Sequence, residues 1–169
     1  MAGTVNTATI EMPSSQWEAR FLAILASLEI DKPENPSFTV KEYTERDLVF
    51  RYEHTLDINK CLNVSYYDDG NDKFNSAILT IKLDEIGGVV EPVLFAIIAT
   101  TLAGEPKAEA QQVVELVNAV CPQLYDVLIG DERYNGSQTG TLHGVGYAIE
   151  LNDNERLVRF LTNVELTQK

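Results

Sequence analysis

Residues 62–83 read LNVSYYDDGNDKFNSAILTIKL, and this stretch decides the fold class. Apolar and polar residues alternate on both sides of its centre, which is the pattern of half-buried β-strands. The centre, residues 68–72, consists of Asp, Asn and Gly, whose side chains and backbones suit tight turns. The stretch therefore predicts an antiparallel β-hairpin.

The chain before this hairpin predicts one helix and two further strands. Ser15 and Glu18 match a capping box, and an apolar stripe at helical spacing follows them, so we expect a helix over residues 15–29. The two prolines at positions 33 and 36 form a connector. Alternation resumes at residues 38–41 and 48–53, which we expect to be strands.

The chain after the hairpin predicts helices followed by a second hairpin. Pro92 and Gly104 bracket an apolar run that favours a helix, although a buried strand has the same composition. A third helix is expected to begin near Pro106, and Pro122 is expected to kink it or to end it near Val120. Residues 130–140 are turn-rich, and strands at 145–151 and 158–164 are expected to flank a turn at 152–155.

The predicted order of elements is α-ββββ-αα-ββ. Because strands and helices occur in separate blocks, we expect an α+β fold, with an antiparallel sheet of about six strands packed against two or three helices. Residues 1–14 are expected to be a flexible N-terminal segment and residues 15–169 a single domain, since the length suits one domain.

The chain of 169 residues has 26 acidic and 13 basic side chains, a formal net charge of −13. This acidity argues against nucleic acid and against an anionic membrane as partners, because both are bound by Lys and Arg. The charge is spread along the chain, so we expect it to matter only if the turns at 68–72 and 152–155 fold onto one face. The longest apolar run is shorter than the about 20 residues of a membrane span.

The two cysteines, Cys61 and Cys121, stand far apart without a CxxC pattern. We expect free thiols in a reducing cytoplasm, with a single long-range disulfide as the alternative. No stretch has the spacing of a metal site, a phosphate-binding loop or a nucleophile motif. The sequence accordingly predicts no cofactor, no metal and no catalytic residue.

Candidate partner-binding residues surround the central turn. Tyrosine is enriched in binding hot spots, and one of two adjacent tyrosines on a strand points away from the core. Carboxylates beside these rings would favour a basic partner protein. The residues concerned are Tyr66, Tyr67, Asp68, Asp69 and Asp72.

Two alternatives concern the histidines and the glycines near the C-terminus. Gly144 and Gly146 indicate a bulge or a close backbone approach, and with His143 and Tyr147 they are the candidate wall of a small-ligand pocket between sheet and helices. An enzyme of the hydrolase type would need His143 or His54 beside a carboxylate or a thiol.

Taken together, these features predict a non-catalytic, acidic, cytoplasmic domain that binds another protein and self-associates as a homodimer. In size, acidity and order of elements the chain is similar to small acidic binding proteins such as secretion chaperones and toxin-immunity proteins. This similarity is one of architecture alone, since no motif accompanies it.

Overall fold

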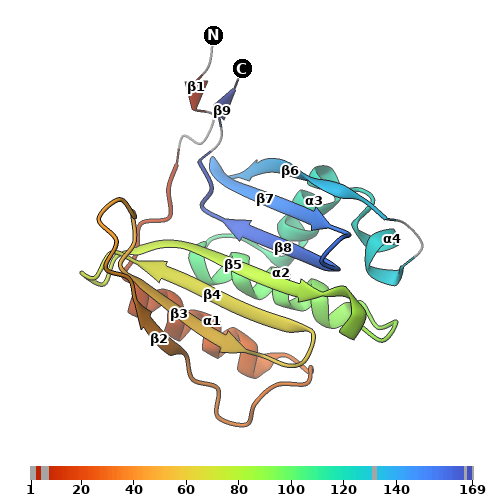
Figure 1. Cartoon of the computed structure of the whole chain (residues 1–169), viewed down its shortest axis with the longest axis horizontal. Helices are drawn as coiled ribbons and strands as arrows, with labels where there is room; N and C mark the ends of the chain where they lie inside the picture. The colour runs from red at the N-terminus through yellow and green to blue at the C-terminus, as the bar shows by residue number, and fades with distance from the viewer. Residues whose placement is uncertain (1–2, 5–7, 131–132, 166, 169) are drawn as a thin grey trace.

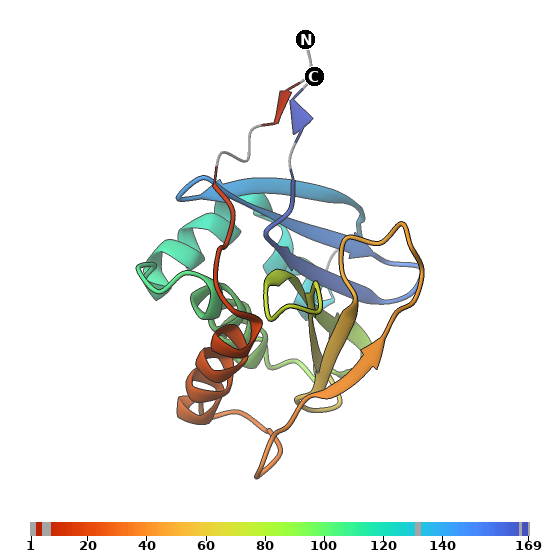
Figure 2. The ribbon, with the colours of Figure 1, turned by 90° about the vertical axis from the view of Figure 1, so that its left-hand side faces the viewer.

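The computed structural model describes residues 3–4, 8–130, 133–165 and 167–168. One antiparallel sheet of seven strands forms its centre, and helices cover one face of that sheet (Figures 1 and 2). The predicted α+β class is thereby confirmed. None of the helices in the described part of the chain combines the length and the apolar character of a membrane span.

The sheet has the strand order β2-β3-β4-β5-β8-β7-β6, and all neighbours are antiparallel. The strands β2 and β6 form its two edges. A separate pair, β1 and β9, joins the two ends of the chain away from the sheet (Figure 1). The bounds are β1 (Gly3–Thr4), β2 (Thr39–Glu42), β3 (Tyr52–Asp57), β4 (Leu62–Asp68), β5 (Phe74–Lys82), β6 (Asn135–Leu142), β7 (Val145–Asn152), β8 (Leu157–Thr162) and β9 (Thr167–Gln168).

The helices lie between the two groups of strands or before them, and they pack on one face of the sheet (Figure 2). They are α1 (Ser14–Ser27), α2 (Glu91–Gly104), α3 (Ala110–Val120) and α4 (Leu124–Ile129), with a short 3₁₀ turn at Leu83–Glu85. The apolar run that the sequence left open between helix and strand is the helix α2. Val93 and Ile97 of α2 are fully buried, as expected for a helix on the core side.

The core lies between the helices and the sheet. Trp17, Phe21 and Leu25, which form the predicted stripe of α1, are completely buried. The Trp17 ring stacks on Phe21 at 5.2 Å and on Phe74 of β5 at 5.3 Å. The contact with Phe74, together with that of Trp17 with Tyr66 of β4 at 5.0 Å, fixes α1 over the strands β4 and β5.

The open face of the sheet is more polar. Arg159 of β8 lies opposite Thr80 of β5 and Glu150 of β7, and all three belong to that face because directly paired residues point to the same side.

Three elements differ from the sequence-based expectation. Residues 135–142, predicted as turns, form the edge strand β6, because the two-residue turn His143-Gly144 folds them onto β7. The strand expected at 48–53 begins only at Tyr52 and runs to Asp57, and α4 was not predicted. For β6, pairing with the adjoining strand β7 outweighs the turn-like local composition.

Part of the segment 1–14 lies against the domain. Ile10 is buried in the core, and the Phe74 backbone N–H donates to the Met12 carbonyl at 3.1 Å. Both cysteines are free thiols, Cys61 partly exposed and Cys121 buried.

Candidate functional site

The beginning of α1 meets the turn between β4 and β5. Asp72 in this turn accepts three hydrogen bonds of 2.8 Å, from the Ser15 backbone N–H and from the Ser14 and Ser15 hydroxyls. A helix start leaves N–H groups unpaired, and a carboxylate satisfies them well. These bonds, that of the Ser15 N–H first, hold the pKa of Asp72 below its usual value.

Asp68, the last residue of β4, is a buried carboxylate with three partners. His54 Nε2 on the neighbouring strand β3 lies 2.6 Å from Asp68 Oδ2, and Ser14 Oγ lies 3.3 Å from the same oxygen. The Gly70 backbone N–H donates to Asp68 Oδ1 at 2.8 Å. Asp68 therefore ties together the sheet, the turn and the start of α1.

Tyr66 connects the same cluster to the side of α1. Its ring lies flat against the His54 imidazole, with centroids 4.3 Å apart, and its hydroxyl donates to Glu18 Oε1 at 2.7 Å. Burial, followed by the bond to Glu18, raises the pKa of Tyr66 well above its ordinary value. Tyr66 is therefore a neutral hydrogen-bond donor at any physiological pH.

These groups line a depression of about 460 Å³ that opens to solvent beside the edge strand β2; we call it the acidic pocket. Its wall contains three carboxylates, one Phe ring, two Tyr rings and the His54 imidazole, and the described residues that line it include no Lys or Arg. The lining residues are Ser14, Ser15, Glu18, Phe38, Val40, Tyr52, His54, Tyr66, Asp68, Gly70 and Asp72.

The structure divides the five predicted partner-binding residues between the two faces of the sheet. Tyr66, Asp68 and Asp72 line the acidic pocket. Tyr67 points to the other face, where its hydroxyl donates to Glu53 Oε2 at 2.7 Å and its ring packs 4.6 Å from that of Phe50. Asp69 lines a second depression, of about 410 Å³.

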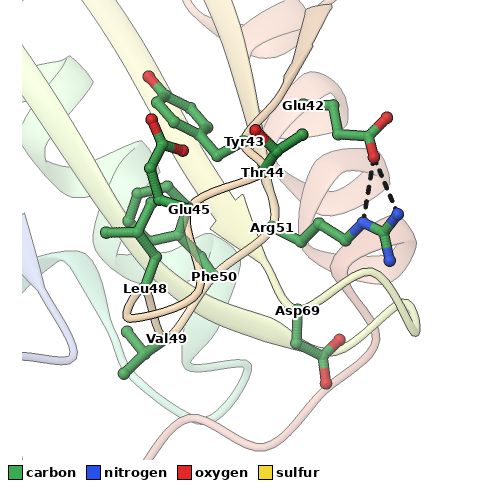
Figure 3. A pocket seen from close by; sticks show the side chains of 9 residues that line it. All are labelled: Glu42, Tyr43, Thr44, Glu45, Leu48, Val49, Phe50, Arg51 and Asp69. Carbon is green, nitrogen blue, oxygen red and sulfur yellow. Dashed lines mark hydrogen bonds and ion pairs between the residues drawn. The ribbon is translucent and has the colours of Figure 1, made fainter.

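This second depression lies along the loop between β2 and β3 (Figure 3). Figure 3 shows Arg51 reaching towards Glu42, with which it forms an exposed ion pair of 2.9 Å. Leu48 and Val49 are exposed apolar residues on the same loop. A Cβ atom on Gly70 would lie 3.1 Å from Arg51, so the acidic pocket and this depression share a wall.

The acidic turns at 68–72 and 152–155 lie at opposite ends of the sheet, because β5 runs from one end to the other and its last residue, Lys82, pairs with Leu157. The two turns therefore form no common patch. The concentration of charge at the acidic pocket arises instead because Glu18 of α1 joins Asp68 and Asp72.

A second cluster contains the other histidine. His143 Nδ1 lies 3.4 Å from Glu105 Oε1, and the Gln112 amide nitrogen lies 3.5 Å from His143 Nε2. Burial raises the pKa of Glu105 to about 7, against the opposing effect of His143. The cluster borders an open depression of about 680 Å³.

Of the four residues of the predicted ligand pocket, His143 is the one that lines this depression. Gly144 occupies the adjoining turn, where its carbonyl accepts from the Ala8 N–H. The Gly146 carbonyl accepts from the Val164 N–H, and Tyr147 is buried in the core with its ring stacked on Phe160.

Both histidines are beside a carboxylate, as an enzyme would require, yet in the described part of the chain neither ring forms a hydrogen bond with a hydroxyl or a thiol. Ser14 bonds to the carboxylates and not to the His54 ring, and the second nitrogen partner of His143 is an amide. Over the same residues, no group of three or more side chains is arranged to hold a metal ion.

The fold and these clusters define an α+β domain with an acidic surface pocket at the start of its first helix. Comparison with known proteins finds no matching family model, no matching curated protein and no matching solved structure. The chemistry of the pocket is therefore the basis for inferring function.

The sequence points to part of this pocket. Asp68 and Asp72 belong to the predicted turn at 68–72, and Tyr66 lies just before it in the chain. Glu18 and His54 come from other elements. His54 lies opposite Tyr66 in the ladder between β3 and β4. The register of that ladder would have identified His54. The predicted strand, residues 48–53, began too early and ended before His54, so it did not give that register.

Proposed function

We propose that this chain is a protein-binding domain and that the acidic pocket receives a Lys or Arg side chain of the partner. The observation that supports this proposal is the composition of the pocket wall, with three carboxylates and no Lys or Arg among its described residues. An ammonium or guanidinium group would complement that charge.

The hydrogen bonds within the pocket leave its negative charge in place. Asp72 is bonded to serine groups and Glu18 to the Tyr66 hydroxyl, and all of these donors are neutral. Only His54, beside Asp68, can supply a positive charge within the described wall. Bonds between a guanidinium and carboxylates are charge-assisted and stronger than bonds between neutral groups.

The aromatic residues favour arginine over lysine. Phe38, Tyr52 and Tyr66 present rings to the pocket, and a planar guanidinium can stack on a ring while donating to carboxylates at its edge. Arg51 already lies over the Tyr52 ring, 5.7 Å from its centroid. An arginine of the partner would likewise find aromatic rings beside carboxylates in the acidic pocket.

The shape of the site supports a side chain of a larger partner. Pockets for small ligands usually enclose most of the ligand surface, whereas this depression is open and adjoins the exposed edge strand β2. The neighbouring loop adds the apolar residues Leu48 and Val49. We place the protein in the cytoplasm, which its two free cysteines support. We regard it as non-catalytic, because among the described residues no hydroxyl or thiol bonds to either histidine ring.

The test uses two peptides that differ only in one residue, arginine or its neutral isostere citrulline. We expect the arginine peptide to shift the backbone amide NMR signals of Glu18, His54 and Asp72, and the citrulline peptide to leave them in place. Glu18→Gln keeps an acceptor for Tyr66 but removes one charge, so it should weaken arginine binding about fivefold, as for the loss of about 1 kcal/mol.

Glu34→Gln is the matched control, because Glu34 is exposed in the connector after α1 and is not part of the pocket wall. It should leave the affinity unchanged. Equal shifts with both peptides, or equal effects of the two variants, would overturn the proposal.

A second candidate function is the binding of a small ligand beside Glu105 and His143. The observation that favours it is the buried Glu105 Oε2 atom, which has no hydrogen-bond partner among the described residues. A small amine is the simplest group to satisfy a carboxylate oxygen. Titration with ethylamine should then shift the amide signals of Gly104 and His143, and unchanged signals would exclude this function.

A further inference from the structure

The edge strand β6 presents an unprotected backbone. It pairs with β7 on one side only, and its register from Asn135 to Leu142 runs without a bulge. Natural edge strands are usually short, charged or interrupted, because unpaired N–H and C=O groups attract other strands. The opposite edge, β2, is short and carries Lys41 and Glu42, whereas β6 is twice as long and contains neither charge nor proline.

The geometry of the turn after β6 shows which N–H and C=O groups of β6 are unpaired. His143 and Gly144 both have positive φ, 52° and 81°, as in a two-residue hairpin turn, so Leu142 and Val145 form a hydrogen-bonded pair. Bonded pairs alternate along an antiparallel ladder. The outward groups therefore belong to Asn135, Ser137, Thr139 and Thr141.

An independent hydrogen bond gives the same alternation. Gly146 of β7 lies opposite Thr141, and its carbonyl accepts from the Val164 N–H at 2.9 Å. Val164 is on the side of β7 away from β6, so this carbonyl points away from β6. The pair Thr141 and Gly146 is thus one of the pairs not bonded to each other. The N–H and C=O groups of Thr141 consequently face the free edge of β6.

Gln138 lies at the middle of the four outward-facing residues. Its side chain belongs to the helix-covered side, and its Oε1 atom is buried without a hydrogen-bond partner in the described part of the chain. A buried polar atom left in this state destabilises the protein, because it has lost its hydrogen bonds to water and gained none in return. A second amide group placed opposite would satisfy it, after rotation about the last side-chain torsion.

We propose that β6 pairs with β6 of a second copy of this chain, antiparallel, about a two-fold axis at Gln138. This register joins Ser137 to Thr139 of the second copy and Asn135 to Thr141 of the second copy, in both directions. It provides about eight backbone hydrogen bonds. The two Gln138 side chains face each other across the axis, and the two sheets become one continuous sheet.

Charge favours a second copy at this strand over other surfaces. Each chain carries −13, so most contacts between two copies would oppose like charges. Within β6, residues 135–142 have no formal charge, and the proposed register therefore pairs only neutral residues. This inference is independent of the acidic pocket, which lies at the opposite edge of the sheet.

The register predicts a specific cross-link. Opposed residues of a non-bonded pair have Cα atoms about 4.5 Å apart, within the disulfide range of about 4.4–6.8 Å. We therefore expect Gln138→Cys to form a covalent dimer on oxidation, seen in non-reducing gels. Thr141→Cys is the matched control, because the two copies of residue 141 would be about 20 Å apart along the strands, and we expect it to remain uncross-linked.

Sedimentation velocity of the full chain tests the assembly itself. We expect a dimer at high protein concentration, and Gln138→Lys should raise its dissociation constant at least tenfold by placing two like charges at the axis. Thr39→Lys on β2 should have no such effect. A wild-type monomer at millimolar concentration, or cross-linking at 141 with none at 138, would overturn the proposal. The cross-linking result stands even if Gln138→Lys does not fold.

Discussion

Glu105 shows how burial changes the chemistry of a single residue. It follows α2 directly, is 8% exposed, and has the His143 imidazole as a neighbour at 3.4 Å. Removing a carboxylate from water disfavours its ionised form, which is why the pKa of Glu105 rises to about 7 from 4.5. The folded state therefore prefers the neutral acid.

This preference predicts a decline of stability with rising pH. Below about pH 4.5 the carboxyl is neutral in both states and its contribution is fully present. Between about pH 4.5 and 7 the unfolded chain ionises first, so the contribution is lost as pH rises through the folded pKa of about 7. Glu105→Gln mimics the neutral form, and relative to wild type it should gain about 3 kcal/mol of unfolding free energy between pH 4.5 and pH 8.

Urea unfolding at the two pH values measures this difference. Glu115→Gln on the exposed side of α3 is the control, and its stability should run parallel to that of wild type. A Glu105→Gln curve that also runs parallel to wild type would show that Glu105 ionises normally in the fold.

At the scale of elements, α3 packs closely against β6 because Gly140 of β6 has no side chain. A Cβ atom on Gly140 would lie 2.5 Å from Val120 Cγ2 and 3.5 Å from Leu116. This close approach brings α3 directly onto the edge strand. The glycine that looked like a turn residue in the sequence is thus a packing residue in the structure.

Gly140→Ala should therefore destabilise the fold by about 1–3 kcal/mol, as overpacked positions do. The cost should be smaller by about 1 kcal/mol when Val120→Ala is also present, since the truncated side chain makes room for the methyl group. A double-mutant cycle by chemical denaturation measures this coupling. Strict additivity would contradict the contact between α3 and β6.

At the scale of the whole molecule, the sheet is joined at its centre by a long-range pair. β5 and β8 pair from Ala77 and Thr162 to Lys82 and Leu157, although α2, α3, α4, β6 and β7 all lie between them in the sequence. Both strands are paired on two sides and contain fully buried residues such as Leu79 and Phe160. The edges β2 and β6 lack this double support.

Hydrogen exchange should follow that arrangement. We expect the slowest amides in residues 77–81 and 158–161 and the fastest strand amides in β2, because opening of a central strand requires disruption of the core. Mass spectrometry on peptic fragments measures the order. Protection of β2 equal to that of β5 would contradict it, and protection of β6 that rises with protein concentration would report the proposed pairing.

The elements with strong local signals were predicted correctly from the sequence. The stripe of Trp17, Phe21 and Leu25 indicated α1, and the turn at 68–72 indicated the hairpin of β4 and β5. Both signals arise from residues within a few positions of one another. Residues 135–142 carry no apolar alternation, and they form a strand only because β7 is available as a partner.

The same division holds for the candidate site. The sequence by itself determined an acidic chain of the α+β class, with Tyr66, Asp68 and Asp72 around one turn. The tertiary structure alone decided that His54 and Glu18 join them, because strand register and helix docking depend on contacts between residues far apart in the chain. The same holds for the negative charge. The sequence gives a net charge of −13, but only the packing of α1 on the sheet brings three of the carboxylates into one pocket.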